Sequence, residues 1–309
     1  WHPDKQALNA PICLMARNCV PAVAGFGPLK AQAPATQALP GNCFGAGVVL
    51  SEGGLAVTFA GTAGTLSRLI TNGAWSDVSR VSGGSYHASS TERWQFAFAG
   101  GLAIAIHLLD DPQKYIVGSS TNFSALGGGP PRARYVTMVR DFVVLGCISG
   151  AERQIWWSGL AQPEFWTPGT QSCDSQVFQN GGPVRGLIGG EVGYVFQAEA
   201  VSRMTYLPGS AEIFQFDEVE GGRGLAAPYS LVKVGNAAYY LTADGLYRIS
   251  LGSASAEPIG VGKWAKALIA DIKASSLFTV QGGVDPVNKR IILAYNSSDF
   301  SGSALNRLL

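Results

Sequence analysis

The segment GVVLSEGGLAVTFAGTAGTLSRLITNGAWSDV, residues 47–78, shows the unit from which this chain is built. It holds an apolar strand, a turn at Gly53-Gly54, a second apolar strand, a turn at 61–64, a third strand, and a closing segment that begins at Trp75. Glycine permits the tight turns that join neighbouring antiparallel strands. The segment therefore predicts a small antiparallel sheet of four short strands.

The same pattern returns along the rest of the chain. A second copy begins at Arg93 and a third at Tyr135, and further copies begin near Val184, Ser230 and Leu277. Their starts are separated by roughly 42 to 49 residues, which is the spacing of four-stranded propeller blades. We therefore predict an all-β fold, a β-propeller of about six blades.

Local patterns agree with this fold. Leu102, Ile104 and Ile106 alternate with smaller residues, which is typical of a strand with one buried face. Asp244-Gly245 predicts a hairpin with a type I′ turn, because glycine supplies the positive φ that such a turn needs. The third copy is expected to close on the aromatic segment 165–168.

The ends of the chain differ from the repeats. Residues 1–41 are expected to form an extended N-terminal arm, and residues 42–309 the propeller domain. The reason is a series of prolines that should interrupt regular structure, at Pro21, Pro28, Pro34 and Pro40. The last copy is short, so that either the arm closes the ring or further chain follows. One helix of about two turns is expected at 263–269, between blades.

Composition favours a protein that is covered by partners. Charged residues make up 14% of the 309 residues, against roughly 25% in an average soluble domain. The net charge of +1 provides no overall attraction to nucleic acid or to a membrane surface. No apolar run is long enough for a membrane span. The cysteines are odd in number and include no CxxC pair, which indicates reduced thiols and assembly in a cytoplasm. They are Cys13, Cys19, Cys43, Cys147 and Cys173.

A set of short segments in fixed order carries a resemblance. They are NCVP (18–21), GFGP (25–28), FAGT (59–62), WSDVS (75–79), FSAL (123–126), PPRARY (130–135), VRDFVVLG (139–146), FWTP (165–168), GGPVRGLIGG (181–190), PIG (258–260) and VDP (284–286). Over most of its length the chain resembles the tail-nozzle and packaged-DNA-stabilisation proteins of short-tailed bacteriophages.

The resemblance implies a structural virion protein. Such a propeller assembles as a homo-oligomeric ring, a hexamer, below the portal and the tail adaptor. It retains the packaged double-stranded DNA, forms the conduit for DNA ejection and anchors distal tail spikes, fibres or needles. The expected location is the virion tail, after assembly in the bacterial cytoplasm.

Arginine is the polar residue whose placement is suggestive. If several arginines point into the lumen of a ring, they would meet the phosphate backbone of DNA without reading bases. The alternative is that they form salt bridges or subunit contacts, with Glu152, Glu199 and Glu220 as partners. The candidates are Arg132, Arg134, Arg140, Arg153, Arg185, Arg203 and Arg223.

The sequence contains no convincing catalytic motif. We expect that the protein is not an enzyme and that it has no cofactor and no metal site. Ser85, His87 and Asp77 could be combined into a triad, but no GxSxG motif surrounds a serine. The pairs Asp110-Asp111 and Asp217-Glu218 could serve glycoside cleavage, although a turn and a solvated strand edge explain them better. His107 is expected to be an ordinary residue at a strand end.

The aromatic residues leave a rival open. Tryptophans could stack on sugars, although packing between blades is the preferred interpretation. They are Trp75, Trp156, Trp157 and Trp166, with Phe165 beside them. The alternative function is therefore a stand-alone propeller that binds a carbohydrate or protein ligand. A propeller hydrolase is a weaker alternative, because no converging acid and base can be identified.

Overall fold

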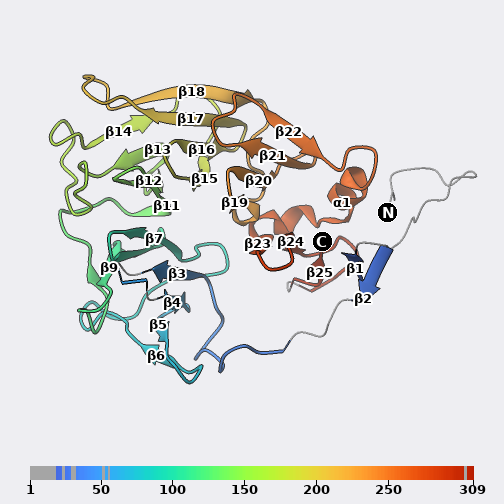
Figure 1. Ribbon diagram of the computed structural model, residues 1–309, viewed down its shortest axis with the longest axis horizontal. Helices are drawn as coiled ribbons and strands as arrows, with labels where there is room; N and C mark the ends of the chain where they lie inside the picture. Colours follow the sequence, from blue (N-terminus) through green and yellow to red (C-terminus); the bar gives the residue numbers. More distant parts are fainter. Residues whose placement is uncertain (1–18, 23–24, 29–32, 51–52, 55, 303–304) are drawn as a thin grey trace, which may run out of the picture.

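The computed structural model of the chain describes residues 19–22, 25–28, 33–50, 53–54, 56–302 and 305–309. In this part of the chain six antiparallel sheets follow one another around a common centre, as the blades of a propeller do (Figure 1). Five sheets have four strands and the last has three. The prediction of an all-β propeller of about six blades is confirmed.

Each blade is made of strands that are consecutive in the chain and pair with their neighbours. The first blade consists of β3 (Ala46–Leu50), β4 (Ala56–Gly61), β5 (Leu66–Leu69) and β6 (Trp75–Asp77). The second consists of β7 (Gln95–Ala99), β8 (Leu102–Ile106), β9 (Gln113–Ile116) and β10 (Ser124–Ala125). The third consists of β11 (Ala133–Val139), β12 (Phe142–Ile148), β13 (Ala151–Trp157) and β14 (Asp174–Val177).

The other three blades continue the same order. The fourth blade consists of β15 (Val184–Ile188), β16 (Gly193–Gln197), β17 (Ala200–Tyr206) and β18 (Phe214–Gly221). The fifth consists of β19 (Val232–Val234), β20 (Ala237–Leu241), β21 (Leu246–Ser250) and β22 (Ala256–Ile259). The sixth consists of β23 (Gln281–Asp285), β24 (Arg290–Tyr295) and β25 (Arg307–Leu308). Between the blades lie the helices η1 (Pro228–Ser230), α1 (Ala265–Asp271) and η2 (Ala274–Thr279).

Blade strands are buried on two faces, not on one as predicted. In β8 the residues Leu102, Ile104 and Ile106 pack towards the third blade. The alternating residues Ala103 and Ala105 are equally buried and pack towards the first blade. The alternation therefore records side-chain size and not polarity, because a blade is covered by a neighbour on each side.

Five apolar clusters hold the blades together. They join the first blade to the second, the second to the third, the third to the fourth, the fourth to the fifth and the fifth to the sixth. Among the described residues no cluster joins the sixth blade to the first. The ring is therefore continuous through five interfaces and open at one place.

At this place two apolar faces are exposed in the described part of the chain. On β3, Val49 is buried against the second blade, whereas Val48 and Leu50 point the other way and are 54% and 67% exposed. On the sixth blade Ile292 is 37% exposed, and Leu308, which shares its face, is 48% exposed. We call these four residues the seam.

Several local predictions need correction. The helix lies at Ala265–Asp271, within two residues of the predicted range. Segment 165–168 lies in the connection between β13 and β14 and is not a strand, because Trp166 turns into the core instead. Leu277 belongs to η2, so that the sixth blade begins at Gln281.

The hairpin at Asp244-Gly245 forms, but its turn is not of type I′. Neither residue has a positive φ. Instead the Thr242 hydroxyl accepts hydrogen bonds from the backbone N–H groups of Asp244 and Gly245 at 3.3 and 3.2 Å. A side chain before the turn thus replaces the backbone geometry that glycine would have supplied.

The arm is more regular than its prolines suggested. Pro21 and Pro28 lie in β1 (Cys19–Ala22) and β2 (Gly25–Pro28), which pair with each other in a sheet separate from the blades. Proline is tolerated in such strands because each has a free edge that needs no N–H donor. Residues 33–45 contain no regular element, and the remainder of the arm lies outside the described residues.

Candidate functional site

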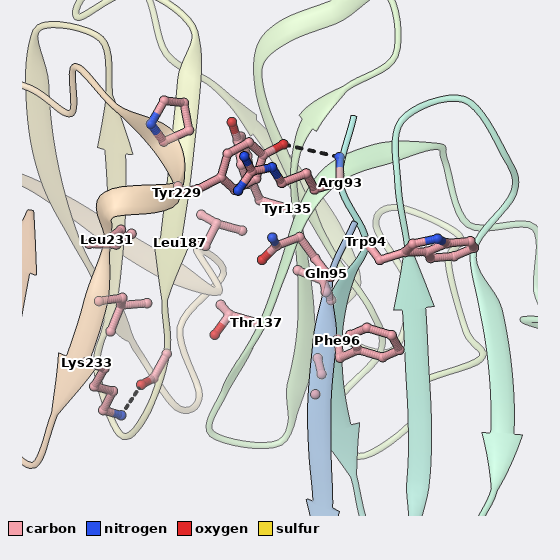
Figure 2. A pocket seen from close by; sticks show the side chains of 18 of the residues that line it. Arg93, Trp94, Gln95, Phe96, Tyr135, Thr137, Leu187, Tyr229, Leu231 and Lys233 are labelled. Carbon is pink, nitrogen blue, oxygen red and sulfur yellow. Dashed lines mark hydrogen bonds between the residues drawn. The ribbon is translucent and has the colours of Figure 1, made fainter. Parts of the chain in front are cut away.

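The first strand of every blade borders a central cavity of about 670 Å³. Its lining comes from β3, β7, β11, β15, β19 and β23, with the loops that precede them. Within its sheet the first strand of each blade pairs only with the second strand, so that its other edge faces the centre. The exception is a bridge between Val139, at the end of β11, and Gly190. Backbone donors and acceptors of six strands therefore face one space, which several side chains also enter (Figure 2).

Arg93 occupies one end of the cavity. Its Nη2 donates to the Thr279 carbonyl at 3.0 Å, and its Nη1 donates to the Gln281 side-chain oxygen. Its guanidinium also lies 4.4 Å from the ring centroid of Tyr229. These contacts, which we call the Arg93 bridge, tie the second blade to the start of the sixth and to the loop before the fifth.

The hydroxyl of Tyr229 extends the same bridge. It donates to the Thr91 carbonyl at 2.9 Å and accepts from the Arg93 backbone N–H at 3.3 Å. Burial raises the pKa of Tyr229 and lowers the pKa of Arg93. The bridge therefore joins blades that no apolar cluster connects, close to the seam.

Lys233 lies towards the other end of the cavity (Figure 2). Its Nζ donates to the Gly189 carbonyl at 2.5 Å. Gly189 is necessary here, because a Cβ at this position would lie 1.7 Å from the Met138 carbonyl oxygen. The close approach of these two backbone segments brings the hydroxyl of Thr137 near the same glycine.

The cavity is electrostatically one-sided. Of the described residues that line it, Arg93 and Lys233 are cationic and none is an aspartate or glutamate. Neither cation lies within ion-pair distance of a carboxylate in the described part of the chain. In the described part of the chain the partners of the two cations are carbonyl, amide and aromatic groups, so that the side chains lining the cavity carry a net positive charge.

None of the seven predicted arginines lines this cavity. Five of them form ion pairs with carboxylates, as the alternative interpretation required, but only Glu220 among its three suggested partners is used. The pairs are Arg132–Asp111 (2.7 Å), Arg134–Glu92 (2.7 Å), Arg140–Glu191 (3.7 Å), Arg203–Asp217 (2.9 Å), and Arg223 with Glu220 (3.4 Å) and Asp244 (3.2 Å).

The other two arginines bind backbone carbonyls. Arg153 donates to the Gln179 carbonyl at 3.1 Å. Arg185 donates to the Leu225 carbonyl at 3.1 Å and lies 5.4 Å from the ring centroid of Phe278. The seven side chains thus link strands and blades within one subunit. Whether any also faces the lumen of an oligomer stays a prediction.

Three of the four candidate tryptophans pack between blades, as the preferred interpretation predicted, and Trp75 does not. Trp157 belongs to the cluster between the third and fourth blades, and Trp166 to that between the second and third. Trp156 packs against the latter cluster. Trp75 is partly exposed and donates to the Gln37 carbonyl at 3.0 Å, which fastens the last part of the arm to the first blade.

The suggested triad does not assemble. His87 Nδ1 lies 3.1 Å from Asp110 and not beside Asp77, whose carboxylate accepts the Ser79 N–H. Asp110 is also 3.0 Å from the buried His107 and 3.0 Å from the Arg80 guanidinium. Burial lowers the pKa of His107 to about 4. His107 Nε2 lies beside the Asp110 carboxylate but makes no well-formed hydrogen bond. In the described part of the chain no serine hydroxyl is bonded to His87, so that no nucleophile is in position.

The described residues contain no group of three His, Cys, Asp or Glu side chains that could hold a metal ion. They also contain no helix with the length and apolarity to cross a bilayer. The four described cysteines, Cys19, Cys43, Cys147 and Cys173, are free thiols, and Cys13 lies outside the described residues.

Sequence reasoning missed Arg93 and Lys233. Arg93 lies two residues before β7, the first strand of the second blade, and Lys233 lies within β19, the first strand of the fifth. Their position in or just before a first strand was the available signal, because those strands border the centre of any propeller. The arginines of the middle blades are more numerous, but none of them lines the cavity.

No protein-family model matches the chain. No curated protein matches it. Solved structures with similarity are the extracellular domain of a putative hybrid two component system from B. thetaiotaomicron (11% identity, 81% of this chain, 32% of that chain, TM-score 0.48), the Neurospora crassa Pan2 WD40 domain (10%, 71%, 66%, 0.43) and the computationally designed Ika8 protein (13%, 68%, 59%, 0.41). The chain spans between a third and two thirds of the length of these three. Similarities of this size carry no information about function.

Proposed function

We propose that this chain is a structural subunit of the tail of a short-tailed bacteriophage, a propeller that forms a ring with its copies below the portal and adaptor. In this role it retains packaged DNA, lines the ejection conduit and anchors distal tail parts. The proposal is supported by the resemblance of the ordered sequence segments and by a charged fraction of only 14%. It requires no cofactor.

The observation that carries the proposal is the seam. Monomeric proteins rarely leave contiguous large apolar side chains in water, and such surface is typical of assembly interfaces. The four seam residues are 37–67% exposed, and they lie at the one place where, among the described residues, no apolar cluster joins neighbouring blades. A neighbouring subunit would cover this surface and complete the open ring.

The remainder of the subunit suits a mechanical part. Five apolar interfaces and a series of arginine ion pairs make each blade rigid relative to the next. Ion pairs at the surface contribute only about 0–1 kcal/mol each, so that the apolar interfaces provide most of the rigidity. A rigid ring can hold DNA under pressure by steric closure and needs no chemistry.

The test is the mass of the chain in solution, followed by electron cryomicroscopy of any ring. We expect an oligomer that Leu50→Glu disrupts, because the substitution places a charge on the seam. Val177→Glu is the matched control, since Val177 is 46% exposed on the outer strand of the third blade. A monomeric wild type, or equal effects of the two variants, would contradict the proposal.

The central cavity favours a second candidate, a stand-alone propeller that binds a ligand. Cavities of this volume with a few converging polar groups are the usual form of small-molecule sites. This candidate predicts a monomer whose seam substitutions change neither mass nor ligand binding.

A further inference from the structure

We propose that the central cavity is a binding site for a small organic anion, a molecule that carries a carboxylate or phosphate group. The site is formed within one subunit by the first strands of all six blades. It is independent of the proposed role in assembly and would exist in a monomer or in a ring.

The first argument is charge. Arg93 and Lys233 enter the cavity without a carboxylate partner, and no acidic side chain lines it in the described residues. Lys233 is exposed, whereas Arg93 is half-buried. Partial burial of a cation without an anion is costly, and it lowers the pKa of Arg93. A bound oxyanion would offset this cost with charge-assisted hydrogen bonds, which are about twice as strong as neutral ones.

The second argument is unused hydrogen-bonding capacity. A guanidinium has five N–H donors. Arg93 uses three of them, for Ser90, Thr279 and Gln281, so that two remain. The amide of Gln95 and the hydroxyl of Thr137 enter the cavity and have no hydrogen-bond partner in the described part of the chain. Figure 2 shows them between the two cations.

The third argument is shape. Phe96, Leu187 and Leu231 form apolar parts of the wall (Figure 2). The volume of about 670 Å³ lies in the range of sites for drug-sized molecules. A ligand with a compact carbon skeleton and one or two anionic groups matches this combination. The site is too small for a nucleic-acid duplex, which separates it from the proposed conduit.

The experiment is calorimetric titration of the full chain with citrate and with glycerol 3-phosphate, and with neutral maltose as contrast. We expect at least one of the anions to bind once per subunit, more weakly as salt increases, and maltose not to bind. Citrate alone or glycerol 3-phosphate alone would assign the carboxylate or the phosphate class. Binding of neither, or binding of maltose with equal affinity, would overturn the proposal.

Variants locate the site. Lys233→Gln should weaken anion binding about tenfold or more, because it removes one of the two cations that line the cavity. Lys233 is exposed, so that the substitution leaves the core intact. Lys263→Gln is the matched control, an exposed lysine outside the cavity. Thr137→Val, which removes a hydroxyl and no charge, should also weaken binding. Equal affinities of the Lys233 and Lys263 variants would place the anion elsewhere and refute the inference. Failure of ring assembly would leave these titrations unaffected.

Discussion

Replacement of Arg93 should loosen the open side of the ring. Arg93→Met keeps most of the side-chain length but removes the charge, hydrogen bonds to Ser90, Thr279 and Gln281, and the contact with the Tyr229 ring. Hydrogen bonds contribute about 0.5–1.5 kcal/mol each, and a cation–π contact about 0.5–1 kcal/mol. Methionine recovers part of the packing, so that we expect a loss of about 3 kcal/mol.

The assay is urea unfolding followed by circular dichroism, with thermal unfolding as a second measure. For a domain of this size a loss of about 3 kcal/mol corresponds to a decrease of the melting temperature of about 6 °C. Arg153→Met is the control, because Arg153 is exposed and donates to one carbonyl. Its replacement should change the free energy of unfolding by less than about 0.5 kcal/mol.

Hydrogen exchange locates the effect. The bridge holds Thr279 and Gln281 at the start of the sixth blade, so that amides of β23 should lose protection in Arg93→Met while those of β12 keep it. If the variant unfolds like the Arg153 control, or if protection falls evenly over all blades, the reasoning that the bridge closes the ring is wrong.

Two further predictions concern buried groups. Because the folded-state pKa of His107 is about 4 and its ordinary value is 6.5, unfolding takes up a proton between these values. Stability should therefore be fully present above about pH 6.5 and decrease by up to about 3 kcal/mol as the pH falls to 4, a slope that His107→Asn should reduce in urea titrations. Gly189→Ala should lower the free energy of unfolding by about 1–3 kcal/mol, because its Cβ would lie 1.7 Å from the Met138 carbonyl oxygen. Gly283→Ala, with open space at its Cβ, should cost much less, and equal melting temperatures would contradict this account.

Local features of the sequence were sufficient for the strands and their order. The strands of the first blade lie within a few residues of the apolar runs in 47–78, because strand and turn preferences act between neighbours in the chain. The period of the copies then gave the number of blades, since each unit must bury its faces against another of its kind. Where a local rule failed, as at Asp244-Gly245, a nearby side chain had taken over the task of the turn.

Tertiary structure decided everything that depends on residues far apart in the chain. The partner of Arg134 is Glu92, and the partners of Arg93 lie more than 130 residues away at Tyr229, Thr279 and Gln281. The seam is likewise invisible in the sequence, because Val48 and Val49 have the same side chain and differ only in which blade, if any, covers them. Composition and period specify that blades form, whereas the sites between them arise from pairings that only the folded arrangement of six blades brings together.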